Sequence, residues 1–421
     1  MRGLILTNLY AIPSDPARGI FNQQQFLALN QLHELLVVVP MARRFLCASA
    51  ASREAGSQER GAALPQVVRF NVWHPPLTGR LSNAAMVYLT LLRVCRGEFA
   101  TRMPDYVMGS FAYPEGVAAV MLARRLGVPA FVKVHGTDIN SMARRGWQRR
   151  QIGWALRNAD GVIAVSRPLA EAVGRLGARQ ADTLVLRNGL DTQLFQPRDR
   201  AAARRRLLLP TERRSVLFVG NLKRAKGVMD LARAFSQLCS HRADVDLEYV
   251  GAGPAREELQ QWITRNRLGD RVRLHGACAH EDITHWLGAC DLLCLPSHAE
   301  GMPNVVVEAL ASGRPVVATD VGGIAELMTA SNGRLVAAAD PAGLESALRE
   351  CLDIRWNAEQ IASGVDAMNW AQNASRLNDF LRARCRRPPT ANPPAANAPS
   401  ADAPSADAPS ADAPSTVASP C

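Results

Sequence analysis

Short apolar runs alternate along the chain with longer amphipathic segments of helical length. We predict a strand at each apolar run, namely at 4–6, 36–39, 67–71, 106–108, 130–134, 161–165, 183–187, 215–219, 246–250, 272–274, 292–295, 315–318 and 333–336. Strands and helices that alternate at this spacing form parallel sheets covered by helices on both faces. The pattern therefore predicts an α/β fold.

The strands form two series, separated by the polar, arginine-rich stretch 196–214. A chain of 421 residues is also long enough for two domains, each with its own core. We therefore predict two doubly wound, Rossmann-like domains that face each other across a cleft, at residues 1–195 and 196–365. A helix over 366–386 is expected to cross back to the first domain.

The end of the chain, residues 387–421, is rich in Ala, Pro, Ser and Asp and repeats one short unit of these residues. Such a segment has almost nothing to bury and cannot offset the entropy of ordering. We predict a disordered tail.

The net charge of +11 is concentrated in the first half of the chain. Residues 1–190 contain 23 Lys and Arg against 11 Asp and Glu, whereas the remainder contains 26 against 27. A basic surface attracts nucleic acid, anionic lipid or a phosphorylated acceptor. Aromatic residues are few and no RNA-binding aromatic motif occurs, which argues against nucleic acid and favours the other two partners.

Two glutamates, Glu300 and Glu308, flank a tight turn after the predicted strand 292–295. Pro303 suits the first turn of the helix expected next, because its missing N–H costs nothing there. The first amides of that helix suit a phosphate group, and ionised carboxylates accept hydrogen bonds from sugar hydroxyls. The stretch therefore predicts a nucleotide-sugar clamp exposed to the cleft, with Glu300 at the sugar, Glu308 at the ribose and the amides at the diphosphate.

The segment EGMPNVVVE, residues 300–308, resembles the E-x7-E motif of retaining glycosyltransferases of family 4, which have the GT-B fold. Further segments resemble that family in the same order: HGTDIN (135–140), NGLDTQLFQP (188–197), FVGNLKRAKG (218–227), VGAGP (250–254) and VRLHG (272–276). The resemblance covers about residues 1–385. It extends to bacterial cell-envelope polysaccharide enzymes such as the teichuronic acid glycosyltransferases, which likewise carry Gly-Asn-Leu before the lysine.

The resemblance implies a glycosyltransferase of the hexosyltransferase type in envelope polysaccharide or exopolysaccharide biosynthesis. It would move a sugar from a UDP- or GDP-sugar to a hydroxyl of a saccharide or a lipid-linked saccharide, with retention at the anomeric carbon. The N-terminal domain would bind the acceptor and the C-terminal domain the nucleotide sugar. No metal or other cofactor is expected, because a lysine and helix amides would neutralise the diphosphate.

The resemblance also implies the roles of the candidate site residues. Glu300, Lys226 and His135 would be catalytic, with Lys226 at the diphosphate leaving group and His135 hydrogen-bonded to the donor sugar. The other donor-binding candidates are Gly19, Asn221, Arg224, Gly301, Met302, Pro303, Asn304, Val305 and Glu308. The alternatives are an ordinary loop glycine, a surface lysine, a structural histidine and solvated glutamates.

Two positions leave alternatives open. Asn221 stands where the family usually has an arginine, so Lys223 or Arg224 would have to supply the missing charge. Asp138 would contact the donor or the acceptor, or it would instead bind the amides of the helix that follows it.

Two other functions fit the same motifs. One is a GT-B sugar-nucleotide epimerase, which would act on the donor alone. The other is a catalytically silent module that binds nucleotide sugars.

No apolar run reaches the ~18 residues that span a bilayer, and the scattered cysteines fit a reducing compartment. We expect a cytoplasmic protein attached peripherally to the inner face of the cytoplasmic membrane through its first domain. Residues 81–102 and 142–157 place apolar or aromatic side chains beside arginines, which suits an interfacial helix on anionic lipid. The alternative is that both segments pack their apolar faces inward.

Overall fold

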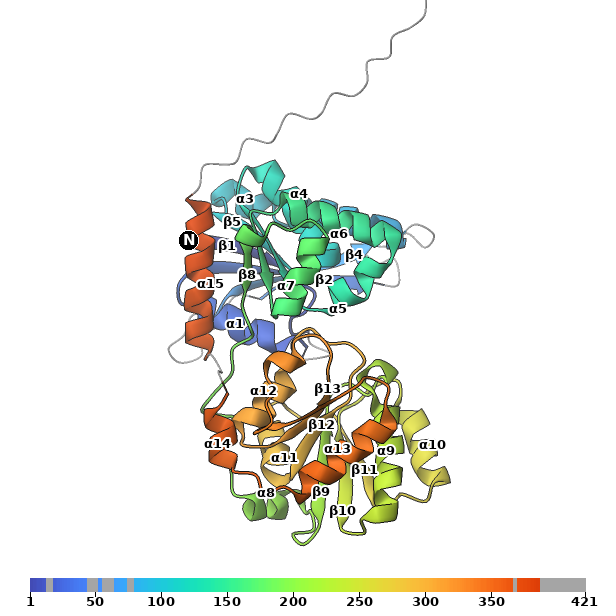
Figure 1. Ribbon diagram of the computed structural model, residues 1–421. Helices are drawn as coiled ribbons and strands as arrows, with labels where there is room; N and C mark the ends of the chain where they lie inside the picture. The colour runs from blue at the N-terminus through green and yellow to red at the C-terminus, as the bar shows by residue number, and fades with distance from the viewer. Residues whose placement is uncertain (13–17, 44–51, 55–63, 74–78, 366–368, 387–421) are drawn as a thin grey trace, which may run out of the picture. The chain divides into compact units, whose positions relative to one another are not determined.

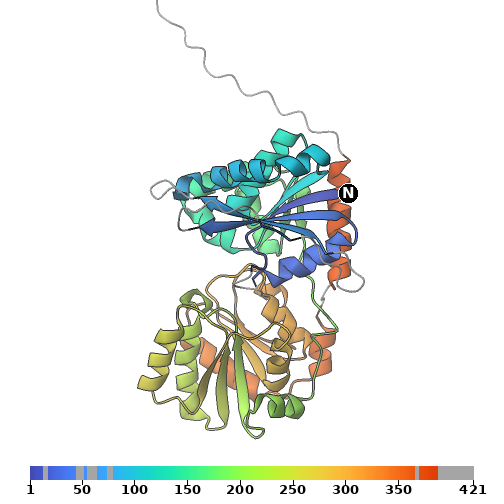
Figure 2. The ribbon, with the colours of Figure 1, turned by 180° about the vertical axis from the view of Figure 1, so that it is seen from behind.

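The computed structural model describes residues 1–12, 18–43, 52–54, 64–73, 79–365 and 369–386. Residues 1–387 form one compact unit, which contains two sheets with helices packed against them (Figures 1 and 2). The predicted α/β fold with two mainly parallel sheets is confirmed. The predicted disordered tail lies outside the described residues.

Within the described residues the first sheet has eight strands, in the order β3-β4-β2-β1-β5-β6-β7-β8. The strands are β1 (Arg2–Leu6), β2 (Glu34–Arg43), β3 (Ser52–Glu54), β4 (Gln66–Trp73), β5 (Tyr106–Ser110), β6 (Ala130–Val134), β7 (Gly161–Ala164) and β8 (Thr183–Val185). The helical elements are α1 (Ile20–Asn30), α2 (Gly79–Val94), α3 (Arg96–Thr101), η1 (Ala112–Gly116), α4 (Val117–Leu126), α5 (Thr137–Asn140), η2 (Met142–Arg144), α6 (Gly146–Asn158), α7 (Arg167–Arg175) and η3 (Gln180–Asp182). Neighbouring strands are parallel except β3, which is antiparallel to β4.

The second sheet has six parallel strands in the order β11-β10-β9-β12-β13-β14. The strands are β9 (Arg214–Val219), β10 (Val245–Val250), β11 (Val272–Gly276), β12 (Leu292–Leu295), β13 (Val316–Thr319) and β14 (Gly333–Val336). The helical elements are α8 (Arg200–Leu207), η4 (Arg224–Lys226), α9 (Val228–His241), α10 (Arg256–Arg265), α11 (Ile283–Ala289), α12 (Asn304–Ala311), η5 (Ile324–Glu326), α13 (Pro341–Asp353), α14 (Ala358–Ser363) and α15 (Trp370–Cys385).

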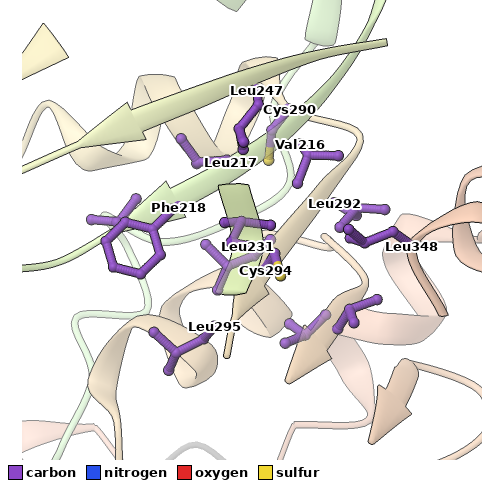
Figure 3. Packing of buried hydrophobic residues seen from close by; sticks show 14 of the residues in the cluster. Val216, Leu217, Phe218, Leu231, Leu247, Cys290, Leu292, Cys294, Leu295 and Leu348 are labelled. Carbon is purple, nitrogen blue, oxygen red and sulfur yellow. The ribbon is translucent and has the colours of Figure 1, made fainter. Parts of the chain in front are cut away.

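The second sheet forms because its central strands are mainly apolar. Every residue of β12 and β13 is buried. Figure 3 shows this core, in which Val216 and Leu217 of β9 belong to the same apolar cluster as Leu231 of α9. A parallel strand buried on both faces reads as a continuous apolar run, so the sequence pattern located these strands well.

The last helix of the described chain, α15, packs on the first sheet although it follows the second sheet in sequence. Its Leu377 and Leu381 are fully buried and belong to the same apolar cluster as Phe26 and Leu29 of α1. The views from both sides place α15 beside the first sheet (Figures 1 and 2). A capping box between Asn369 and Gln372 starts the helix by satisfying backbone N–H groups at its N-terminus.

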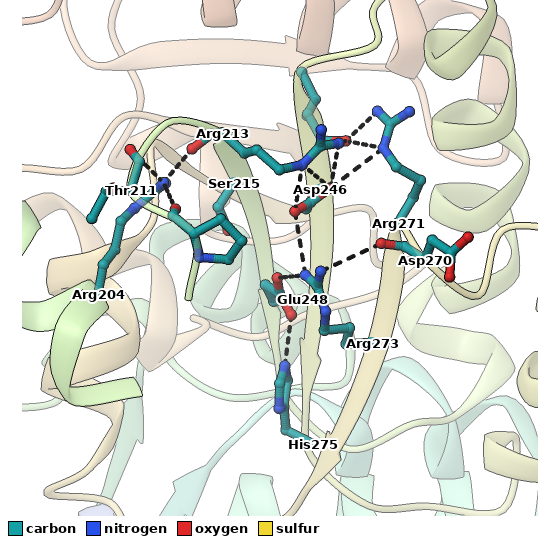
Figure 4. A network of polar contacts seen from close by, with 12 residues as sticks. Arg204, Thr211, Arg213, Ser215, Asp246, Glu248, Asp270, Arg271, Arg273 and His275 are labelled. Atoms are coloured by element: carbon teal, nitrogen blue, oxygen red, sulfur yellow. Dashed lines mark hydrogen bonds and ion pairs between the residues drawn. The ribbon is translucent and has the colours of Figure 1, made fainter. Parts of the chain in front are cut away.

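A ladder of charges stabilises the edge strand β11. The carboxylate of Asp246 on β10 lies within 3.3 Å of three arginines, which are Arg213, Arg271 and Arg273. On the same strand Glu248 lies 2.7 Å from Arg273 (Figure 4). Because the carboxylate of Asp246 is almost completely buried, these arginines supply the hydrogen bonds and the opposite charge that stand in for solvation by water. Charged side chains on an edge strand also discourage pairing with a strand of another molecule.

We predict that Asp246→Asn destabilises the fold. Removing one partner of a fully buried ion pair costs about 3–5 kcal/mol, and the partial exposure of the arginines lowers the expected loss to about 1–3 kcal/mol. Urea unfolding measures this loss. Asp353→Asn is the control, because Asp353 pairs with Arg242 but its side chain is 66% exposed. Equal losses in both variants would contradict the burial argument.

Candidate active site

The strand order places a crevice between β9 and β12. These strands are neighbours in the sheet, but the chain continues from β9 to one side and from β12 to the other. In parallel sheets ligands bind at such a point, outside the carboxyl ends of the strands. The loop after β9 contains residues 220–227, and the loop after β12 contains residues 296–303. These loops hold most of the predicted donor-binding residues.

Lys226 and Glu300, two of the predicted catalytic residues, are in direct contact. The Lys226 ammonium lies 2.6 Å from Glu300 Oε1, which also accepts a hydrogen bond from the Ser297 hydroxyl at 2.7 Å. The side chain of Lys226 is 32% exposed and that of Glu300 is 9% exposed. A ligand can therefore reach the lysine, whereas the carboxylate is largely buried.

Gly227 allows the two loops to approach each other. Its φ is +67°, and a Cβ at this position would lie 1.9 Å from the carbonyl oxygen of Pro296. Both the left-handed backbone and the close approach require glycine. The glycine after Lys226 thus fixes the lysine beside the loop that carries Glu300.

Glu308 occupies the second turn of α12, and its side chain is only 8% exposed. Its Oε1 lies 2.9 Å from His280 Nε2, and the His280 ring packs on Phe195 with centroids 5.2 Å apart. Burial alone would lower the pKa of His280, but the hydrogen bond and charge of Glu308 outweigh it and raise the pKa.

The turn 301–303 and the start of α12 contact the first domain. A Cβ at Gly301 would lie 2.0 Å from the carbonyl oxygen of His135, and Met302 is buried in the apolar cluster of the first sheet. Pro303 is the N-cap of α12, as the sequence predicted for a helix start. Asn304 Oδ1 accepts a hydrogen bond from Asn188 at 2.9 Å.

Val305, also predicted to bind the donor, packs as a partly buried residue against the core of the second sheet. Its neighbours on the helix are the buried Val306 and the partly buried Asn304. The backbone N–H of Val305 lies in the first turn of α12 and fits the predicted phosphate contact, whereas its apolar side chain does not.

His135 follows β6 and is held between two aromatic rings. Its ring lies 5.2 Å from that of Phe21 and 6.2 Å from that of Phe111, and its Nε2 lies 2.9 Å from the Ser110 hydroxyl. Burial, helped by the charge of Lys133, holds the pKa of His135 well below its usual value. The ring is therefore neutral at neutral pH and can serve as a hydrogen-bonding group.

Asp138 is completely buried and binds backbone amides. Its carboxylate accepts hydrogen bonds from the N–H groups of Ala112, His135, Gly136 and Ile139 at 2.8–3.1 Å. Of the two roles left open for this residue, these contacts describe the amide-binding one. Asp138 thereby joins the loops after β5 and β6.

Gly19 starts α1 with a φ of +64°. A Cβ there would lie 2.2 Å from the carbonyl oxygen of Leu9, so the fold of the chain itself requires glycine. Its predicted approach to the donor stays a prediction. The side chain of Phe21, in the first turn of the same helix, contacts the ring of His135.

The charge missing at Asn221 has two possible sources in the neighbouring residues. Arg224 is 76% exposed and forms two hydrogen bonds to the Glu258 carboxylate, one of them 2.9 Å long. Lys223 is exposed and forms no ion pair with another described residue. Arg224 would have to leave Glu258 to reach a diphosphate, whereas Lys223 would not have to break an ion pair.

A cavity lies beside Glu308 of the predicted clamp, and neither Lys226 nor Glu300 is among its lining residues. It is lined mainly by α1, the crossing segment between the domains and α12, with single residues from other segments: Ile20, Phe21, Gln24, Arg187, Asn188, Gly189, Leu190, Asp191, Leu194, Phe195, His280, Met302, Asn304, Val307, Glu308, Leu327 and Trp370. Sequence reasoning had proposed Met302, Asn304 and Glu308 but had missed His280 and Asn188. Asn188 belongs to the NGLD segment, whereas His280 stands alone in a polar loop and gave no signal.

Metal ligands do not gather in the described part of the chain. No group of three or more His, Cys, Asp or Glu side chains there could hold a metal ion. The expectation that no metal takes part stays a prediction.

The two doubly wound α/β domains agree with the GT-B architecture that the sequence motifs predict. The family described as "Glycosyl transferases group 1" matches residues 213–353, and the "Glycosyl transferase 4-like domain" matches residues 23–189. The predicted resemblance is therefore confirmed: the chain belongs to the family 4 glycosyltransferases of GT-B fold, which act on sugar nucleotides. It is a transferase.

Relatives and solved structures agree with this assignment. The putative teichuronic acid biosynthesis glycosyltransferase TuaC of Bacillus subtilis is 29% identical over 344 residues, which are 78% of this chain and 83% of the relative. D-inositol 3-phosphate glycosyltransferase 1 of Catenulispora acidiphila is 31% identical over 315 residues, or 67% and 74% of the two chains. The structure of HepE from Anabaena in complex with UDP has a TM-score of 0.69 at 22% identity, covering 91% of this chain and 100% of that one.

We predict that the His280–Glu308 contact stabilises the fold in a pH-dependent way. The pKa of His280 is raised in the folded state, so the stabilisation is fully present below the unfolded value of about 6.5 and is lost as the pH rises through the folded value. His280→Gln should therefore lose more stability at pH 5.5 than at pH 8.5 in urea unfolding. The exposed His241 provides the control variant His241→Gln. A deficit of the same size at both pH values would rule out the charged pair.

Proposed function

We propose that this protein transfers a sugar from a nucleoside diphosphate sugar to a hydroxyl acceptor, with retention at the anomeric carbon. The observation that carries the proposal is the contact of Lys226 with Glu300 at the switch point of the second sheet. One residue supplies a positive charge for a diphosphate, and the other supplies acceptor oxygens for sugar hydroxyls. Retention is supported by the E-x7-E motif from Glu300 to Glu308, which resembles that of the family's retaining enzymes.

Lys226 would stabilise the leaving group. The diphosphate gains negative charge as the bond to the sugar breaks, so a fixed cation beside it lowers the barrier. The first amides of α12 would bind the same group and make a metal unnecessary. Glu300 would then exchange its bond to the lysine for bonds to the sugar hydroxyls.

Glu308 would bind the ribose, and His280 would hold its carboxylate in place. The two side chains are 2.9 Å apart, and both line the cavity. A carboxylate fixed by a neighbouring donor keeps its second oxygen available for a hydroxyl. His280 therefore acts as a positioning residue in this proposal.

The relatives suggest the class of donor and acceptor. The structures of HepE contain UDP, UDP with glucose, or UDP-glucose, which favours a UDP-sugar over a GDP-sugar here. The name of TuaC places that protein in teichuronic acid biosynthesis. We propose a saccharide or lipid-linked saccharide acceptor in envelope polysaccharide or exopolysaccharide biosynthesis.

Transfer is tested with a panel of UDP- and GDP-sugars and membrane lipid extract. Radiolabel that moves from one donor to lipid or saccharide supports the proposal. Isomerised donor without transfer would indicate an epimerase, and donor binding without any reaction would indicate a silent module.

We predict that Glu308→Ala weakens donor binding while the fold survives. Loss of one hydrogen bond to a charged group costs about 1.5–3 kcal/mol, or roughly a 10- to 150-fold rise in Kd. Lys226→Ala should mainly lower kcat, because the charge it stabilises grows in the transition state. Calorimetry measures donor affinity, and saturation kinetics measure kcat. The control is Glu350→Ala on α13. Donor affinity unchanged in Glu308→Ala would remove this residue from the site.

We further propose that the first domain attaches to the inner face of the cytoplasmic membrane. The described chain contains no helix long and apolar enough to cross a bilayer. The buried faces of α2 and α6, including Val87, Leu91 and Ile152, pack inward, as the alternative expected. On the outer faces, however, Leu89 is 45% and Trp147 is 48% exposed.

The arginines around Trp147 support this proposal. The exposed set in this segment is Arg144, Arg145, Arg149, Arg150 and Arg157. An exposed tryptophan among arginines suits the interface of an anionic membrane, where the ring enters the headgroup region and the cations bind phosphate.

We predict that the protein sediments with anionic liposomes at low salt and much less with neutral ones. Attraction between arginines and lipid weakens as the Debye length falls from ~10 Å at 0.1 M to ~3 Å at 1 M salt. The triple variant Trp147→Ala, Arg149→Ala, Arg150→Ala should lose most of this binding. The exposed arginines of α8 provide the control Arg205→Ala, Arg206→Ala. Equal binding to neutral and anionic liposomes, or none to either, would defeat the proposal.

A further inference from the structure

Lys133 is a buried lysine without a counter-charge among the residues that the structure describes. It lies on β6, two residues before His135, and its exposed fraction is 0%. Its ammonium forms no ion pair within the described residues. Burial lowers the pKa of Lys133 to about 7, because a charge without water is disfavoured there. A methionine of similar length would fill the same space at lower cost, so the lysine needs another explanation.

Two amide side chains of α1 hold the ammonium. Lys133 Nζ donates to Gln25 Oε1 at 2.6 Å and to Asn22 Oδ1 at 3.3 Å, and both residues are fully buried. The ammonium also lies 5.8 Å from the centre of the Phe21 ring. These contacts fix the first two turns of the helix that begins at Gly19.

The network continues from Asn22 to the active-site histidine. Asn22 Nδ2 donates to the carbonyl of Leu9, the same group that Gly19 approaches. The Ser110 hydroxyl is directed at Asn22 Oδ1 at 3.4 Å and lies 2.9 Å from His135 Nε2. When this hydroxyl donates to Asn22 it accepts from Nε2–H of His135, and in that arrangement Nδ1 is the acceptor nitrogen.

In the other direction the network reaches the helix that returns from the second domain. Gln25 Nε2 donates to Asn373 Oδ1 at 2.6 Å, and Asn373 Nδ2 donates to the carbonyl of Arg187 at 2.6 Å. Asn373 lies on α15, and Arg187 lies in the crossing segment beside the cavity. Lys133 is thus at the centre of a buried polar chain between His135 and the crossing segment.

We propose that Lys133 is a positioning residue that aligns His135 and the first turn of α1 on the donor sugar. The proposal rests on the proposed function, because it takes His135 and the Gly19 turn as donor-facing. The positive charge of Lys133 disfavours protonation of His135, and the bonds through Asn22 and Ser110 fix the histidine tautomer. The ring then presents a bare Nδ1 to a sugar hydroxyl.

The decisive variant is Lys133→Met, which removes the charge and keeps the volume. A purely structural lysine predicts a less stable protein with unchanged kcat and an unchanged His135 titration. A positioning lysine predicts kcat lowered roughly 10- to 100-fold by misalignment, in addition to any loss of stability from leaving the Gln25 oxygen without its donor. Affinity for the free nucleoside diphosphate should not change, since its binding residues lie in the second domain.

Nitrogen NMR of His135 supplies a readout that does not depend on activity. We expect the wild-type ring to remain in the Nε2–H tautomer at neutral pH and to titrate well below the usual range. In Lys133→Met the titration should move to higher pH and the tautomers should mix. Ser110→Ala cuts the network next to the histidine without touching the lysine, and it should reproduce the tautomer mixing and the fall in kcat. His135→Gln assigns the signal.

Asn378→Ala is the matched control, because Asn378 of α15 bonds His33 just beyond the other end of α1 and lies outside this network. It should leave kcat and the His135 spectrum unchanged. An active wild type with a Lys133→Met variant of equal kcat and identical His135 titration would overturn the proposal. A wild type that transfers no sugar from any donor would instead refute the proposed function, while the spectra would still report whether Lys133 controls His135.

Discussion

The order of the parallel strands determines where a ligand can bind this chain. In the second sheet β9 and β12 are neighbours, although β10 and β11 separate them in sequence. The loops that leave these two strands diverge and open a crevice, and they are the loops that carry Lys226 and Glu300. In the first sheet β1 and β5 stand in the same relation, and their loops lead to Gly19 and to Phe111, which packs on His135. In each sheet, therefore, the loops that carry candidate site residues leave the sheet at its switch point.

Glycine lets the loops at these points approach more closely than other residues would. Gly227 lies against the carbonyl of Pro296, and Gly301 lies against the carbonyl of His135. In both places a Cβ would overlap a backbone oxygen, which has no freedom to move aside. The close approach of backbone segments is therefore the first reason why these motifs contain glycine. Through that geometry they place Lys226 within hydrogen-bond distance of a carboxylate.

Continuous burial made the sheets predictable from sequence, and β6, β12 and β14 have the predicted bounds. The strand β3 was missed because its residues, Ser-Arg-Glu, are polar and become a strand only by pairing with β4. The order of the strands in each sheet could not be predicted, since an apolar run does not show which strands it will pair with. For the same reason the motifs located Glu308 but not His280, whose contact with it depends on how the sheet places the loop after β11. Lys133 was read simply as part of a strand, because its amide partners lie on α1, more than 100 residues earlier.

In the second domain the charged groups of the site are already bonded to one another: Lys226 to Glu300, and His280 to Glu308. A ligand that separates one of these pairs must give each side chain a new hydrogen-bond or charge partner, because a largely buried charge left without a partner costs free energy. A free phosphate would satisfy Lys226 and leave Glu300 with the Ser297 hydroxyl but without a cation, whereas a free sugar would bind Glu300 and leave Lys226 without an anion. On the proposed function, a nucleoside diphosphate sugar brings anionic oxygens and hydroxyl donors on one molecule and exchanges both bonds together. The pairing of these groups therefore favours the whole donor over its fragments before any contact specific to the sugar is made.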